Sequence, residues 1–224
     1  LSTRRLMMQV ADRIVRFREA DLYVVITEAY CAGRSGLDVL DACLEAGVRL
    51  VQLREKHMDD RQLYETARLW RKRTKAAGAL FILDDRVDIA LASGADGVHL
   101  GQNDLPFPAA RALAPDLILG LSTHNPEEAL AAQEAGASYI NIGPIFPTNT
   151  KEVPTGAVGT AMIEAIRPLL HIPFTCMGGI KANNIDQVLS AGASIAAVVT
   201  AVTAAPDVSA AVAELRKKIL QYRA

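Results

Sequence analysis

The chain has 224 residues, half of them apolar, with 24 basic and 25 acidic side chains. A net charge of −1 excludes the basic footprint of a protein that binds nucleic acid or an acidic membrane surface. No apolar run approaches the roughly 20 residues that span a bilayer, and the N-terminal stretch lacks a signal-peptide pattern. We therefore expect a cytoplasmic protein with neither membrane nor nucleic-acid partners, and a homo-oligomer is allowed.

The first 20 residues predict one amphipathic helix. Leu6, Val10, Ile14 and Phe17 recur at helical spacing. We expect a helical extension over residues 1–20 that packs on the N-terminal side of a single catalytic domain over residues 21–224.

From residue 21 onward, short apolar runs alternate with longer helical patterns, which is typical of βαβ units and a parallel sheet. The predicted strands are 22–27, 50–56, 80–85, 97–100, 118–122, 139–143, 174–178 and 195–200. The predicted helices are 37–46, 60–77, 86–93, 108–114, 126–135, 160–170, 184–191 and 208–222. Eight units favour a closed (β/α)8 TIM barrel, although glycines after several helices would also suit an open doubly wound sheet.

The three cysteines, Cys31, Cys43 and Cys176, lack the spacing of a zinc site and are odd in number. They favour buried, reduced thiols over a disulfide framework.

Polar side chains gather at the end of the second predicted strand. Period-two alternation puts Gln52, Arg54 and Lys56 on one face. Two cations on one face suit the oxygens of a diphosphate or triphosphate. The alternative is a surface strand in which Glu55 pairs with a neighbour, but strands covered by helices rarely carry solvated faces.

Carboxylates end the third and fourth predicted strands, at Asp84, Asp85 and Asp104. Mg²⁺ takes one or two carboxylates and shares the oxygens of substrate phosphates. Asp85 could equally be the N-cap of the following helix. Spacing alone leaves both interpretations open.

Two later segments suit phosphate binding. The loop after the sixth predicted strand carries Thr148, Thr150 and Lys151 between prolines and glycines, which suits either a closing flap or an exposed polar loop. Gly179 and Thr200 follow the seventh and eighth predicted strands, where barrels often bind phosphate through backbone N–H groups.

The histidines show no metal-ligand spacing. We expect His99, inside an apolar strand, to be a core histidine with its hydrogen bonds satisfied. His124 follows the fifth predicted strand and should border the barrel mouth.

Taken together, VQLREK (51–56), DDRVDIALASGADGVHLGQNDLP (84–106), GLSTHN (120–125), GPIFPTNTK (143–151) and GGI (178–180) resemble the thiamine phosphate synthase family. The resemblance runs from residue 22 to the C-terminus, with the motifs in family order. It implies a transferase that condenses hydroxymethylpyrimidine pyrophosphate with thiazole phosphate, giving thiamine monophosphate and pyrophosphate with Mg²⁺ as cofactor.

The resemblance also implies residue roles. Gln52 would address the pyrimidine, and Asp85 and Asp104 would hold Mg²⁺. The pyrophosphate would be held by Arg54, Lys56, Ser122 and Lys151. The thiazole phosphate would lie against Thr148, Asn149, Thr150, Gly179, Val199 and Thr200.

The chain departs from the family in two places. Asp84 stands where the family usually has Asn, so an ionised acceptor replaces an amide that can donate to pyrophosphate. We expect Asp84 to bind Mg²⁺ or to pair with a cation. The segment 151–156 is also shorter than usual. The alternatives are a TenI-like thiazole tautomerase, and a catalytically silent phosphate-binding regulatory barrel, which Asp84 favours.

Overall fold

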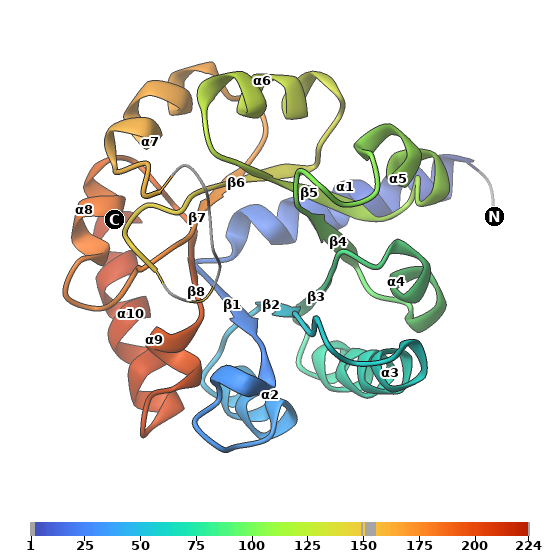
Figure 1. Ribbon diagram of the computed structural model, residues 1–224, viewed down its shortest axis with the longest axis horizontal. Helices are drawn as coiled ribbons and strands as arrows, with labels where there is room; N and C mark the ends of the chain where they lie inside the picture. The colour runs from blue at the N-terminus through green and yellow to red at the C-terminus, as the bar shows by residue number, and fades with distance from the viewer. Residues whose placement is uncertain (1–2, 149, 151–155, 224) are drawn as a thin grey trace.

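The protein forms a closed barrel of parallel strands in a computed structural model that describes residues 3–148, 150 and 156–223 (Figure 1). The strands pair in chain order and β8 pairs back to β1. They are β1 (Leu22–Ile26), β2 (Leu50–Leu53), β3 (Leu80–Asp84), β4 (Gly97–Leu100), β5 (Ile118–Thr123), β6 (Tyr139–Ile142), β7 (Phe174–Cys176) and β8 (Ala196–Val198). The predicted (β/α)8 TIM barrel is therefore confirmed.

Helices surround the barrel (Figure 1). They are α1 (Thr3–Glu19), α2 (Gly36–Glu45), α3 (Asp60–Ala76), α4 (Val87–Ser93), α5 (Phe107–Leu113), α6 (Pro126–Glu134), α7 (Ala161–Ile166), α8 (Ile185–Ser190), α9 (Thr200–Thr203) and α10 (Val208–Arg223). Short 3-10 turns follow β1, at η1 (Glu28–Tyr30), and α7, at η2 (Arg167–Leu169). None of the helices in the described part of the chain is long and apolar enough to cross a membrane.

Six predicted strands were too long at their C-terminal ends, namely β1, β2, β3, β6, β7 and β8. Three of these ends have a plain physical reason. Strand β2 stops at Leu53, the last residue paired with β1 and β3, so Arg54 and Lys56 lie in the following loop. Strand β3 stops at Asp84 because Asp85 has a left-handed φ of 58°. Strand β8 stops at Val198 because Thr200 already begins α9.

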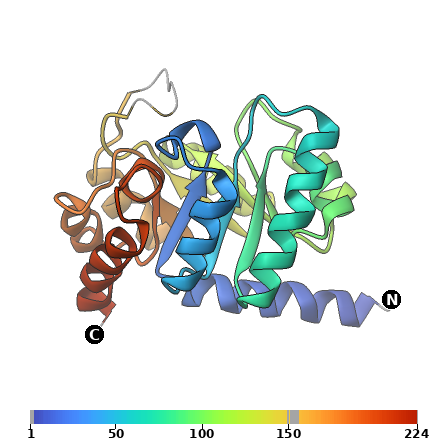
Figure 2. The ribbon, with the colours of Figure 1, turned by 90° about the horizontal axis from the view of Figure 1, so that it is seen from below.

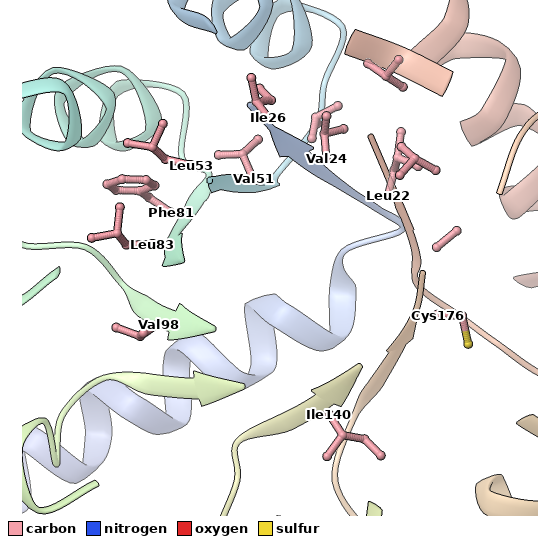
Figure 3. Close-up of a cluster of buried hydrophobic side chains, with 14 of the residues drawn as sticks. Leu22, Val24, Ile26, Val51, Leu53, Phe81, Leu83, Val98, Ile140 and Cys176 are labelled. Carbon is pink, nitrogen blue, oxygen red and sulfur yellow. The ribbon is translucent and has the colours of Figure 1, made fainter. Parts of the chain in front are cut away.

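Side chains alternate between the two faces of the barrel wall. Val24, Val51 and Phe81 point outward and pack against the helices (Figure 3). Residues one position away, such as Tyr23 and Leu50, point inward and form a second apolar cluster. This alternation leaves the inward positions at the strand ends free to carry polar groups.

Helix α1 closes one end of the barrel, opposite the end at which the loop after β6 emerges (Figure 2). Phe17 of this helix is 1% exposed and belongs to the inner apolar cluster. Arg13 ties the helix to the barrel, because its Nη1 donates to the Asp116 carbonyl at 2.6 Å and its Nε lies 3.3 Å from Asp96 Oδ1. The predicted extra helix thus forms the floor of the barrel.

Candidate active site

Every predicted site residue that the structure describes lines a cavity at the C-terminal ends of the strands. The charged pocket, of about 70 Å³, is lined by Gln52, Arg54, Lys56, Asp84, Asp85, Asp104 and Ser122. The open pocket, of about 530 Å³, is lined by Thr148, Thr150, Gly178, Gly179, Val199 and Thr200. Asn149 and Lys151 lie outside the described residues.

Ion pairs organise the charged pocket. Asp84 Oδ2 lies 3.0 Å from Lys56 Nζ and 3.5 Å from Arg54 Nε, and Lys56 also pairs with Asp85. Asp84 thus pairs with both cations, which is one of the two outcomes expected for this unusual residue. Both cations line the cavity, although they follow β2 instead of belonging to it, and the Lys56 side chain is also 39% exposed.

The carboxyl groups of this pocket are crowded. Burial raises the pKa of Asp84. Burial and the neighbouring Asp84 charge also raise the pKa of Asp85 to about 6, and Asp104 hydrogen-bonds to Asp85. Burial lowers the pKa of Lys56, but the adjacent carboxylates outweigh that effect and the net pKa is raised. An added cation would relieve this crowding.

The donor set suits Mg²⁺ better than a metal that needs a complete protein cage. Within the described ranges, no three His, Cys, Asp or Glu side chains are grouped closely enough to enclose a metal ion. Mg²⁺ commonly takes only one or two carboxylates and completes its shell with water and phosphate oxygens. Asp85 and Asp104 supply two adjoining carboxyl groups, and Gly101 N–H steadies Asp104 Oδ2 at 2.6 Å.

Asp85 is not the N-cap of a helix, so that alternative is wrong. Helix α4 begins at Val87 after Arg86, without a side-chain cap hydrogen bond. The Asp85 carboxylate instead pairs with Lys56. A left-handed φ at a non-glycine residue is uncommon and often marks a functional position.

Backbone dominates one wall of the open pocket. Gly178 and Gly179 have φ of 104° and 63°. A Cβ added at Gly179 would lie 2.6 Å from the Pro147 carbonyl oxygen, so the left-handed turn and the close approach of the loop both require glycine. On the loop, Thr148 Oγ1 and Thr150 Oγ1 lie 3.0 Å apart. The pocket therefore presents backbone groups and hydroxyls.

Sequence reasoning missed residues that line both pockets, among them Tyr30 and Met177. Tyr30 lies in the 3-10 turn after β1, and its hydroxyl donates to the Thr150 carbonyl at 3.4 Å. Met177 directly follows β7. Both residues follow a strand, and this position is the signal that could have identified them. Because neither side chain is charged, a search for charged groups after the strands does not find them.

Both histidine predictions are confirmed. His99 is 7% exposed, with ring nitrogens 2.9 Å from the Tyr139 and Ser122 hydroxyls. It also lines the charged pocket, which the sequence did not indicate. His124 lines a third cavity at the mouth and lies 2.9 Å from Glu128.

The predicted state of the cysteines is also confirmed. Cys31, Cys43 and Cys176 are free and buried. Burial raises the pKa of Cys31 to about 11 and that of Cys43 to about 12, which keeps both as thiols.

Comparison with known proteins gives consistent results. Residues 22–202 match the family described as thiamine monophosphate synthase. A thiamine-phosphate synthase of Pelotomaculum thermopropionicum is 45% identical over 199 residues, covering 88% of this chain and 91% of the relative. One of Chloroflexus aurantiacus is 46% identical over 195 residues, covering 87% and 90%.

Solved structures agree. A thiamine phosphate pyrophosphorylase from Pyrococcus furiosus superposes with a TM-score of 0.87 at 36% identity, covering 94% of this chain and 100% of that chain. A 3-hexulose-6-phosphate synthase superposes with a TM-score of 0.67 at 20% identity, covering 88% and 99%, and shares the fold alone.

Proposed function

Because the chain belongs to the thiamine monophosphate synthase family and is a transferase, we propose that it joins hydroxymethylpyrimidine pyrophosphate to thiazole phosphate. The products are thiamine monophosphate and pyrophosphate. The observation that carries this proposal is the adjacency of the two pockets, because Tyr30, Thr150, Met177 and Val199 line both. A substrate in one pocket would therefore lie beside a substrate in the other.

The charged pocket would hold the pyrimidine substrate. Gln52 would address the pyrimidine ring, while Arg54, Lys56, Ser122 and Lys151 would bind the pyrophosphate group. The difficult step is cleavage of the C–O bond to pyrophosphate, during which negative charge gathers on the leaving group and a pyrimidine methylene cation develops. Cations and hydroxyl donors fixed where that charge appears stabilise the transition state.

Asp85 and Asp104 would hold Mg²⁺, in keeping with their crowded carboxyl groups. When bound, the ion would neutralise negative charge on the pyrophosphate oxygens. Asp84 would keep Arg54 and Lys56 in position, because it pairs with both.

The open pocket would hold the thiazole phosphate. Its phosphate would be bound by Gly179, Val199 and Thr200, together with Thr148, Asn149 and Thr150. The thiazole nitrogen then captures the pyrimidine cation, so the reaction needs no protein nucleophile. We also propose a cytoplasmic location, which the free thiols support.

Product analysis with both purified substrates tests the proposal. We expect thiamine monophosphate and pyrophosphate to form with Mg²⁺, to disappear with EDTA, and to fall strongly in Arg54→Ala. Thiazole phosphate binding without product would contradict synthase activity. Isomerisation of the thiazole in that case would identify a tautomerase, and binding without isomerisation a regulatory barrel.

A further inference from the structure

A chain of hydrogen bonds runs inside the barrel beneath the charged pocket. Gln52 Nε2 lies 2.7 Å from the Tyr23 hydroxyl, which lies 3.3 Å from the Tyr139 hydroxyl. The Tyr139 hydroxyl lies 2.9 Å from His99 Nδ1, and His99 Nε2 lies 2.9 Å from Ser122 Oγ. All five residues are at most 8% exposed. The two ends of the chain, Gln52 and Ser122, both line the charged pocket.

The strand register builds this chain. Gly120 pairs with His99 on one side and with Tyr139 on the other. A Cβ at Gly120 would overlap the Tyr139 ring, so glycine is what lets this ring reach His99 across β5. The two rings stack with centroids 5.5 Å apart, and Phe17 of α1 packs on Tyr139 at 4.3 Å.

Tyr23 and Tyr139 each have one hydroxyl proton to donate. Burial raises the pKa of Tyr23 and of Tyr139 above the usual range, so both remain neutral. The Gln52 amide donates to the Tyr23 oxygen. Either hydroxyl can donate in the Tyr23–Tyr139 hydrogen bond, and either partner can donate between Tyr139 and His99 Nδ1. In one of the two consistent arrangements, Tyr23 donates to Tyr139 and Tyr139 donates to His99 Nδ1.

His99 links the two tyrosines to Ser122 in the charged pocket. In this arrangement Nδ1 accepts a hydrogen bond from Tyr139, so a neutral His99 holds its own proton on Nε2 and donates a hydrogen bond to Ser122 Oγ. The Ser122 hydroxyl hydrogen then points away from His99. The opposite direction would turn that hydrogen toward His99 and present oxygen lone pairs to the anion that Arg54 and Lys56 attract.

We propose that His99 and Tyr139 are positioning residues that fix the Ser122 hydroxyl as a hydrogen-bond donor to an anion in the charged pocket. Hydrogen bonds aligned in one direction polarise and strengthen one another. The identity of the anion as pyrophosphate rests on the proposed function. The direction of the hydrogen bonds does not rest on that function, because it can be measured in the free protein.

Nitrogen NMR of the His99 ring tests the direction. We expect the neutral ring with the proton on Nε2 in the free protein and after addition of pyrophosphate with Mg²⁺. A His99→Gln spectrum assigns the signal by subtraction. A neutral ring protonated on Nδ1 would overturn the proposal.

Pyrophosphate binding with Mg²⁺, measured by calorimetry, tests the consequence. Tyr139→Phe removes one hydroxyl and should weaken binding about 3- to 10-fold, in line with the loss of one neutral hydrogen bond. In a Ser122→Ala background the same change should have no further effect, because Tyr139 acts through Ser122. An equal loss in both backgrounds would show a general structural effect and refute the positioning role.

Two further variants sharpen this test. His99→Gln keeps an amide donor near the position of Nε2 and should retain most of the affinity that His99→Leu loses. Thr74→Val removes a fully buried hydroxyl, bonded to the Arg71 carbonyl on α3, and should leave pyrophosphate affinity unchanged.

The same data separate this proposal from the proposed function. A protein that binds pyrophosphate with the Tyr139–Ser122 coupling but forms no thiamine monophosphate would contradict the function and keep the positioning role. A protein that makes thiamine monophosphate without that coupling would do the reverse. A protein that binds no pyrophosphate would overturn the role of Ser122 as an anion donor.

Discussion

The charged pocket and the open pocket lie side by side at one end of the barrel, yet different groups line them. Arg54, Lys56 and three carboxylates dominate the charged pocket, of about 70 Å³. Glycine backbone and threonine hydroxyls line much of the open pocket, of about 530 Å³. The first can recognise a highly charged group through ions, and the second can recognise a phosphate through directed hydrogen bonds.

This contrast predicts which kind of substitution should impair each pocket. A side chain that carries charge can be removed without disturbing the backbone, so the charged pocket should lose function by loss of positive charge. The glycine wall of the open pocket has no side chain to remove, so it should lose function when side-chain atoms are added, whereas the threonine side should lose function when a hydroxyl is removed. Four variants test this difference, from the largest expected effect to the smallest.

Lys56→Ala should reduce kcat/KM about 100-fold, because the variant loses a charge that faces the leaving group. Steady-state kinetics with each substrate varied in turn would measure the loss. Lys218→Ala is the matched control, since Lys218 pairs with Asp186 between α10 and α8 and should leave kcat/KM unchanged. Equal losses in the two variants would contradict a special role for the Lys56 charge.

Gly179→Ala should raise the KM for thiazole phosphate about 10-fold, because alanine disfavours the left-handed φ and its methyl group would crowd the Pro147 carbonyl. The KM for the pyrimidine substrate should change much less. Gly136→Ala provides the control, with a φ of 85° and nothing within 4 Å of the added Cβ. A rise in the thiazole phosphate KM in both variants would mean that backbone strain alone explains the effect.

Thr148→Val should weaken thiazole phosphate binding about 3- to 10-fold, because it removes one hydroxyl while keeping the side-chain shape. Calorimetric titration of each variant would measure the change, with Thr74→Val as the control for loss of a hydroxyl elsewhere. A loss of affinity confined to the pyrimidine substrate would contradict the prediction, because it would mean that Thr148 serves the charged pocket.

Asp84→Asn should change kcat by less than about threefold at saturating Mg²⁺, since an amide can still accept a hydrogen bond from Lys56. Initial rates over a Mg²⁺ series would give both kcat and the apparent metal affinity. A large gain in activity would show that Asp84 is a handicap, and a large loss of metal affinity would show that it binds the metal.

The sequence predicted the barrel and most of the charged and polar residues of both pockets because both depend on local patterns, whereas Ser122 and Val199 were indicated by the family resemblance alone. Apolar runs fixed the strands, and polar residues just after a strand collect at the same end of a parallel barrel. The strand ends were less predictable. Strand β3 ends because Asp85 adopts a left-handed φ of 58°, which the sequence does not indicate.

The hydrogen-bond chain beneath the charged pocket could not have been predicted in this way. It depends on the lateral register that brings His99, Gly120 and Tyr139 to one level on three strands. A single sequence specifies neighbours along the chain but not this alignment across strands. The role of α1 in covering Tyr139 through Phe17 was hidden for the same reason.

The most direct test of this division between the pockets is the metal dependence of each binding event. Calorimetry with and without Mg²⁺ should show that pyrophosphate requires the ion for tight binding, whereas thiazole phosphate binds with nearly the same Kd in either condition. Equal metal dependence of the two ligands would contradict the division, because it would mean that the carboxylates of the charged pocket serve both.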